Sequence, residues 1–102
     1  GQVVVGNQVN VASSALLCQN ANNIITNNVF GELLGDSSGT VWLPGPGASR
    51  NLVSGNQVST PGPWAIRLGA GVDFNTVTNN VIPPGTLRLD SGVGGNNVIF
   101  SN

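Results

Sequence analysis

The chain has 102 residues and a mass of 10.3 kDa, enough for one small domain or segment spanning residues 1–102. Only 7% of the residues are charged, and three Arg without any Lys cannot form the basic stripe of a nucleic-acid-binding protein. No apolar run approaches the roughly 20 residues of a membrane-spanning helix, so the sequence predicts no membrane span.

The composition favours β-strands joined by tight turns. Hydrophobic residues make up 39% of the chain, and many of them are β-branched. The 15 Gly and the abundant Asn are typical of turns. A net charge of −1 argues against disorder, which combines low hydrophobicity with high net charge. An all-β protein with many short strands is therefore expected.

A segment bounded by Asn recurs along the chain and predicts one strand in each repeat. Each copy has an apolar residue at its third position, and another apolar residue stands two positions after its last residue in four copies (Val9, Phe30, Val58 and Ile82). In chain order the copies are 2–7, in which Gln2 replaces the first Asn, 23–28, 51–56, 75–80 and 97–102.

A second motif lies between these copies, at 15–18, 40–43, 65–68 and 86–89. It consists of a small or hydroxyl-bearing residue, an apolar residue, a variable residue and a final apolar residue. Because side chains alternate along a strand, the second and fourth positions are expected to point inward and the third outward. Each repeat is therefore predicted to contain about three short strands.

This organisation resembles the right-handed parallel β-helix of pectate-lyase-like and other polysaccharide-active proteins and of phage tailspikes. The resemblance covers nearly the whole chain, and its most specific element is the rhythm N-x-[VI]-x-x-N-x-[VIF], as in Asn51, Val53, Asn56 and Val58. It implies a solenoid of about four to five coils, as a fragment or as a subunit of a homotrimer. The alternative is a β-sandwich with strands every 8–12 residues, which does not explain the fixed phase of the Asn residues.

Stacking of coils at a spacing of ~4.8 Å predicts columns of equivalent residues along the solenoid. Four inward columns are expected, and all their members are apolar. They are Leu16/Val41/Ile66/Leu87, Cys18/Leu43/Leu68/Leu89, Val4/Ile25/Val53/Val77/Ile99 and Val9/Phe30/Val58/Ile82. A structural ladder of side-chain amides is expected at Asn7, Asn28, Asn56, Asn80 and Asn102, because each amide has both donors and an acceptor.

The reactive groups are too few and too scattered to predict a catalytic site. Asp73 and Asp90 fall at different phases of their repeats, whereas glycoside hydrolysis uses two carboxyl groups across one bond. Glu32 and Asp36 lie in a Gly- and Ser-rich insertion, 31–39, and are expected to be solvated. With no His and a single Cys, no metal site and no cofactor are expected.

The variable third positions of the second motif predict an outward column with binding chemistry. Trp offers a face for a sugar ring, and guanidinium groups bind carboxylate or sulfate through two parallel hydrogen bonds. The column is Leu17, Trp42, Arg67 and Arg88, and Trp64 and Arg50 are candidates to flank it. We expect this face to bind an acidic polysaccharide. The alternative is that these side chains pack against a loop or a neighbouring subunit, where Trp and Arg are also enriched.

Three interpretations of function remain open. The first is a structural and carbohydrate-recognition segment of a secreted or virion-surface protein of the tailspike or tail-fibre type. The second is a non-catalytic part of a secreted polysaccharide lyase, hydrolase or epimerase, and the third is a purely structural virion decoration or adhesion module. Exposed strand edges at the two end coils predict either a homo-oligomer, such as a trimer, or flanking coils of a longer chain.

Overall fold

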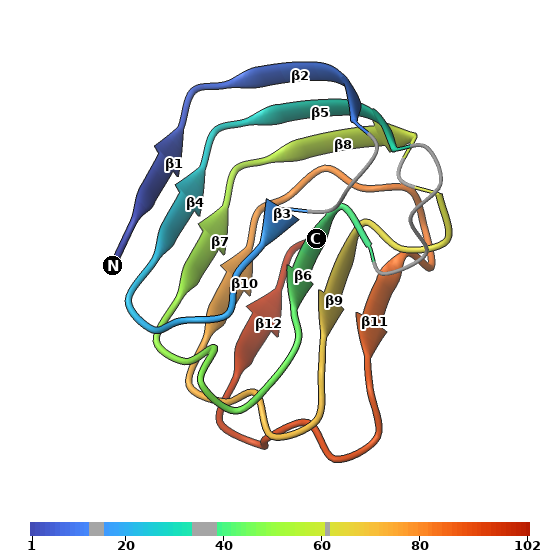
Figure 1. Cartoon of the computed structure of the whole chain (residues 1–102). Coiled ribbons are helices and arrows are strands. Elements are labelled where there is room, and N and C mark those ends of the chain that lie inside the picture. Colours follow the sequence, from blue (N-terminus) through green and yellow to red (C-terminus); the bar gives the residue numbers. More distant parts are fainter. Residues whose placement is uncertain (13–15, 34–38, 61) are drawn as a thin grey trace.

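A computed structural model of the chain describes residues 1–12, 16–33, 39–60 and 62–102. Within these residues the structure is all-β, and its strands form three sheets (Figure 1). Sheet A contains β1 (Val3–Val5), β4 (Ile24–Thr26), β7 (Leu52–Ser54), β10 (Thr76–Thr78) and β12 (Val98–Phe100). Sheet B contains β2 (Gln8–Ala12), β5 (Val29–Leu33) and β8 (Gln57–Thr60). Sheet C contains β3 (Leu16–Leu17), β6 (Val41–Leu43), β9 (Ile66–Leu68) and β11 (Leu87–Leu89).

All the strand pairs are parallel, and each joins one coil to the next. The chain passes from sheet A to sheet B to sheet C and then returns to sheet A, so it forms a β-solenoid of about four turns (Figure 1). The prediction of a stacked parallel solenoid is thus confirmed. The parallel pairing also excludes the β-sandwich alternative, which consists of antiparallel sheets.

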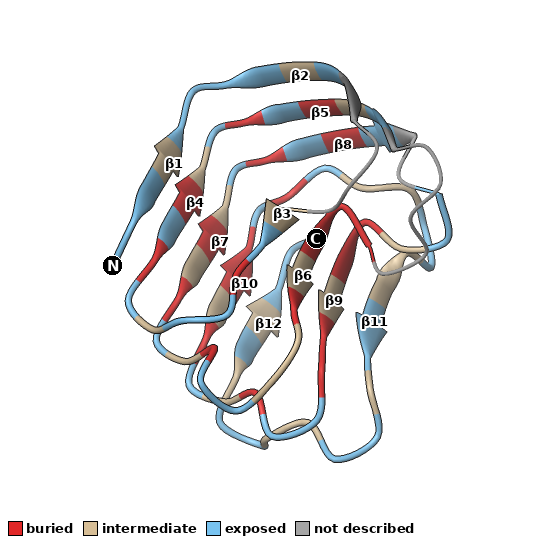
Figure 2. Ribbon diagram, viewed as in Figure 1, coloured by how far each residue is buried: buried red, intermediate tan, exposed pale blue. Residues whose placement is uncertain are grey.

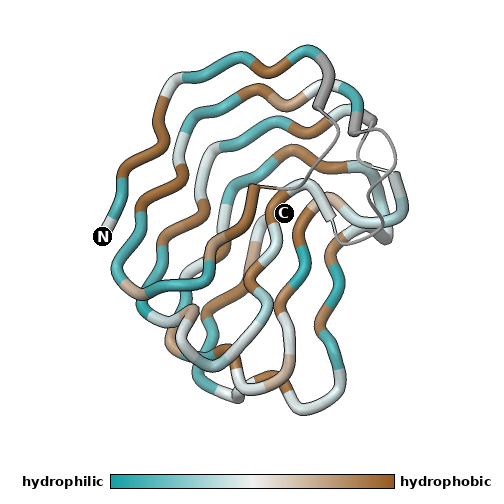
Figure 3. The backbone as a smooth tube through the Cα atoms, viewed as in Figure 1, coloured by the Kyte–Doolittle hydropathy of each residue, from teal (hydrophilic) through white to brown (hydrophobic). Residues whose placement is uncertain are grey.

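The predicted inward columns form the core. In sheet A, the central residue Val53 pairs with Ile25 on one side and with Val77 on the other, and all three are buried. The apolar positions recur at the same place in successive coils (Figure 3). Burial is greatest in the middle coils and decreases toward the end coils (Figure 2). Leu89, expected to be inward, is 48% exposed, because β11 is covered by a neighbouring strand on one side alone.

The corners of the coils have left-handed backbone conformations that the local sequence supports. At the corner between sheets A and B, the residue before each ladder Asn has a φ between 56° and 69°. These residues are Gly6, Asn27, Gly55, Asn79 and Ser101. Gly adopts this region without steric cost and Asn tolerates it, so the Gly-Asn and Asn-Asn pairs of the repeat set the bend.

Part of the predicted insertion 31–39 is in fact strand. β5 extends to Leu33 and places Glu32 beside Val11 of β2 and Thr60 of β8. Gly31 makes this possible, because a Cβ at that position would collide with the backbone carbonyl of Asn10. Residues 34–38, which include Asp36, lie outside the described residues, as do Ala15 and Pro61. In the part of the chain that the structure describes, no helix could span a membrane.

Candidate functional site on the outer face of sheet C

The predicted outward column lies on one face of sheet C, in register from strand to strand. Leu17 pairs with Trp42, Trp42 with Arg67, and Arg67 with Arg88. The strand neighbours of Trp42 on either side, Val41 and Leu43, are fully buried, so the alternation of the strand directs Trp42 outward. The outward column is thus brought together as the repeat predicted.

Asp90 joins the two stacked arginines. Its carboxylate accepts hydrogen bonds from Nε of Arg67 at 3.1 and 3.2 Å, and Nη2 of Arg67 lies 3.1 Å from Oδ2. Nε of Arg88 donates to Oδ1 of Asp90 at 2.9 Å. One carboxylate therefore lies between two guanidinium groups that would otherwise repel each other.

Both tryptophans are covered by an arginine. The guanidinium carbon of Arg67 lies 4.3 Å from the ring centroid of Trp42, and that of Arg88 lies 5.1 Å from the centroid of Trp64. These distances are within the range of cation–π attraction. Trp64 precedes β9, and its backbone carbonyl accepts a hydrogen bond from the N–H of Thr40 at 3.0 Å. We call Trp42, Trp64, Arg67, Arg88 and Asp90 the Trp–Arg strip.

The electrostatics of the Trp–Arg strip follow from these contacts. The hydrogen bond from Arg67, together with that from Arg88, lowers the pKa of Asp90 below its ordinary value, so Asp90 is ionised at neutral pH. Two cations against one anion leave a formal charge of +1 on this face, whereas the whole chain carries −1. Asp90 was missed as a member of the strip, although its position two residues after Arg88 places both side chains on the same side of an extended chain.

Arg50 lies elsewhere. It occupies the corner before β7 with a φ of 55°, in stacked positions with Asn22 and Phe74. There it lines a shallow hollow with Ile24 and other residues on the sheet A side of the solenoid. The structure therefore does not bring Arg50 to the Trp–Arg strip. Leu17 is half-exposed at the N-terminal end of the same outward column.

The predicted amide ladder is present at the corner between sheets A and B. Oδ1 of Asn28 accepts from Asn7, Oδ1 of Asn56 from Asn28, Oδ1 of Asn80 from Asn56, and Oδ1 of Asn102 from Asn80. A second ladder was not predicted, and it runs through Asn23, Asn51, Asn75 and Asn97. The sequence feature that could have predicted it is the Asn at the first position of the four later copies of the repeat. These amides hydrogen-bond to one another and to backbone groups at the corners of the coils. The Trp–Arg strip is therefore the candidate binding surface.

Asp73, which also lies in the described part of the chain, has a different role from Asp90. Oδ1 of Asp73 accepts from the backbone N–H groups of Phe74 and Asn96, and Oδ2 accepts from Nδ2 of Asn96, so Asp73 closes a turn. The hydrogen bond from the Asn96 side chain is the main cause that lowers the pKa of Asp73. Among the described residues, no three Cys, Asp or Glu side chains come close enough to hold a metal ion.

Comparison of the chain with protein-family models, with curated proteins and with solved structures finds no match. The fold and the geometry of the Trp–Arg strip are therefore the basis for a functional proposal.

Proposed function

We propose that this chain is a structural β-solenoid segment that binds an acidic polysaccharide through the Trp–Arg strip. The observation that carries the proposal is the in-register stacking of Arg67 and Arg88 with a single carboxylate between them. This arrangement concentrates two of the three cations of the chain on one face. Arg67 and Arg88 together carry one more positive charge than Asp90 balances, and a polyanion would neutralise this excess charge.

Arg88 is the residue best placed to contact a ligand anion. Its side chain is 45% exposed, compared with 27% for Arg67, and it contacts Asp90 through Nε. Its two terminal nitrogens can therefore donate side by side to a carboxylate or sulfate group. Arg67, which uses both Nε and Nη2 for Asp90, holds the carboxylate in place.

The two tryptophans add apolar surface beside this charge. Both are partly buried, and the guanidinium groups over their rings fix their orientation. Sugar rings present C–H groups that pack on such amphipathic aromatic surfaces, while their acidic substituents pair with arginine. A rigid surface of stacked residues is suited to bind a polymer of repeating anionic sugars. By analogy with the fold, this function is typical of a secreted or virion-surface protein of the tailspike type.

A purely structural role is the second candidate, and a specific observation favours it. Arg67 forms an ion pair with Asp90 and stacks over the ring of Trp42 without any ligand. Such a cluster can offset the repulsion between the stacked arginines. In that case the Trp–Arg strip has no ligand, and its side chains stabilise the outer face of sheet C.

Binding to polygalacturonate, dextran sulfate and neutral dextran, measured by calorimetry at several salt concentrations, tests the proposal. We expect the first two to bind, the neutral polymer not to bind, and salt to weaken the interaction. Arg88→Gln should reduce affinity about tenfold, the equivalent of roughly 1.4 kcal/mol. The matched control is Arg50→Gln, which removes the same charge from the sheet A side. Failure of both polyanions to bind, or equal losses in the two variants, would overturn the proposal and favour the structural role.

A further inference from the structure

The outer face of sheet A is apolar, and its strands contain no charged residue. The alternation of side chains directs the first and third residue of each of these strands outward. More than half of the large apolar residues that are exposed in the described part of the chain lie on this face or at its edge. They are Val3, Val5, Ile24, Phe74, Val98 and Phe100. A continuous group of exposed apolar residues, unlike single ones, marks a contact surface.

A hollow runs along one edge of this face, beside the corner that precedes the strands of sheet A. It is lined by the first residue of three successive strands and by the corner residue of each of these coils. These residues are Ile24, Leu52, Thr76, Asn22, Arg50 and Phe74. The hollow therefore combines apolar side chains, an exposed aromatic ring and a cation.

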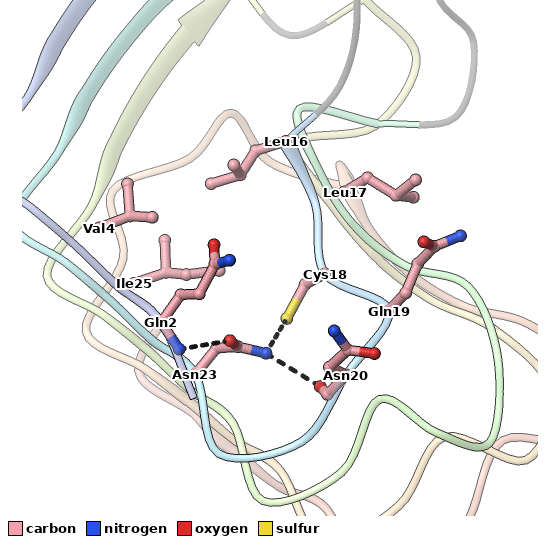
Figure 4. A pocket seen from close by; sticks show the side chains of 9 residues that line it. All are labelled: Gln2, Val4, Leu16, Leu17, Cys18, Gln19, Asn20, Asn23 and Ile25. Atoms are coloured by element: carbon pink, nitrogen blue, oxygen red, sulfur yellow. Dashed lines mark hydrogen bonds between the residues drawn. The ribbon is translucent and has the colours of Figure 1, made fainter.

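The two ladder amides that also line the hollow are already hydrogen-bonded. Nδ2 of Asn23 donates to Sγ of Cys18, and its Oδ1 accepts from the N–H of Gln2 (Figure 4). Nδ2 of Asn51 donates along the same ladder, and its Oδ1 accepts from Asn23. Arg50 is the one charged side chain among the lining residues, and no carboxylate of the described residues forms an ion pair with it. An occupant of the hollow is therefore expected to offer Arg50 an aromatic ring or an anion.

Two of the corner residues have a backbone conformation that is unusual for their type. The φ angle is 58° at Phe74 and 55° at Arg50, in the left-handed region that Gly and Asn tolerate best. Asn22 has the equivalent place in the coil before them, with a φ of 64°. Phe74 is 57% exposed, so contacts of its ring within the described part of the chain offset little of this cost. Such strain is typical of positions where a contact needs the side chain.

We propose that two copies of this chain pack through the outer faces of sheet A, with their solenoids antiparallel. The ring of Phe74 of each copy enters the hollow of the other copy and lies against the guanidinium group of Arg50. The same pairing of an arginine with an aromatic ring occurs twice within the chain, at Trp42 and at Trp64. The two faces then lie ~10 Å apart, as packed sheets do.

The order of the corner residues along the solenoid determines this orientation. The N–H of Arg50 donates to the carbonyl of Phe74, so the two residues occupy the same corner one coil apart. A two-fold axis parallel to the solenoids would place Arg50 opposite Arg50, which is a repulsive contact. A two-fold axis along the strands reverses one solenoid and places Phe74 of each copy opposite Arg50 of the other. Asp73, which precedes Phe74, then brings a negative charge toward the same guanidinium group.

The complementarity favours a second copy as the occupant, because one surface supplies both members of each pair. In the same arrangement Ile24 of one copy faces Val98 of the other, so that exposed apolar residues cover each other. The contact lies along the side of the solenoid and uses neither of its ends. It also uses no residue of the Trp–Arg strip, so each copy can bind a polyanion whether it is paired or alone.

Sedimentation velocity over a wide range of concentration tests the contact. We expect an equilibrium between monomer and dimer. Phe74→Asn removes the ring and should weaken the dimer at least about tenfold. Because Asn tolerates the left-handed conformation, this variant should fold with unchanged or higher thermal stability as a monomer. The matched control is Val81→Asn, which replaces a 67% exposed apolar residue outside this face and should dimerise as the wild type does.

Cross-linking with a short bis-maleimide tests the antiparallel orientation. A mixture of Ile24→Cys and Val98→Cys should give covalent dimers with one chain of each kind. Ile24→Cys alone should give none, because its two thiols lie three coils, or ~14 Å, apart along the solenoids. The wild type, in which the native Cys18 is buried, is the background control.

Four results would overturn the proposal. They are a wild-type chain that stays monomeric at all concentrations, a discrete trimer, a dimer that is insensitive to Phe74→Asn, and cross-linking of Ile24→Cys to itself, which a parallel pair would give. None of them depends on polysaccharide binding, so this proposal and that of the Trp–Arg strip can fail separately.

Discussion

Oδ1 of Asn80 accepts two hydrogen bonds from Asn56, one from its backbone N–H and one from its Nδ2, both at 3.0 Å. The second hydrogen of the Asn56 amide goes to the carbonyl of Ile25 at 2.9 Å. A single buried amide therefore ties together three coils. This rung explains why Asn recurs at the same corner in successive coils, since no apolar side chain could satisfy these backbone groups.

Replacement of Asn56 should accordingly be costly. Asn56→Ala removes the acceptor of Asn28 and the donor to Ile25, and it leaves buried polar groups without partners. We expect a loss of about 2–4 kcal/mol in the free energy of unfolding, measured by urea denaturation. Asn10→Ala, at an exposed position of β2, is the control and should change stability by less than about 0.5 kcal/mol. Equal effects of the two substitutions would contradict a structural role for the ladder.

The bridge between Arg67, Asp90 and Arg88 should make stability depend on pH. The pKa of Asp90 is lower in the folded state than in the unfolded chain, so its contribution is complete above the unfolded value, about 3.9. It is lost as the pH falls through the lower folded value. Asp90→Asn should therefore destabilise the protein by roughly 1 kcal/mol at pH 7.

Urea denaturation of the wild type and of Asp90→Asn at a series of pH values measures this difference. The difference should disappear in strong acid, where Asp90 of the wild type is protonated. Glu32→Gln, which removes an exposed carboxylate on β5, controls for the change in net charge. A difference that stays constant from neutral pH to strong acid would show that the ion pairs contribute nothing.

Gly31 should tolerate no side chain. A Cβ there would collide with the carbonyl of Asn10, and the pairing of β2 with β5 would have to open. We expect Gly31→Ala to lower the midpoint of thermal unfolding by several degrees, as a loss of about 1 kcal/mol does in a domain of this size. Gly45→Ala, where a Cβ meets open space, should leave the midpoint unchanged or raise it slightly. A neutral Gly31→Ala would show that β5 does not approach β2 in this way.

Much of the fold could be predicted from the sequence because the repeat carries two independent signals. The apolar residues of a column, such as Val53 and Val77, give the register, and the Asn residues give the corners. The extension of β5 through Glu32 was missed because its partners are 20 or more residues away, where no local pattern shows them. A Gly inside a strand also looks like a turn until the approach of another backbone explains it.

The candidate site was predicted in part for similar reasons. The stacking of Trp42, Arg67 and Arg88 follows from the register of the repeat alone. The position of Arg50 depends on the path of the turn after β6, which the repeat does not determine. The role of Asp90 depends on side-chain contacts between coils, and these require the orientation of the arginines over the tryptophans.

Disulfide trapping tests the stacked parallel coils most directly. In the structure Leu52 pairs with Thr76, while Thr78 lies two residues farther along the neighbouring strand. Parallel partners are ~4.8 Å apart, within disulfide range, whereas a diagonal pair is about 8 Å apart and too distant. The variant Leu52→Cys/Thr76→Cys should therefore oxidise to a disulfide that links the tryptic peptides 51–67 and 68–88, and Leu52→Cys/Thr78→Cys should not. The opposite result, with the 52–78 pair linked and the 52–76 pair free, is what antiparallel strands would give, and it would contradict the solenoid.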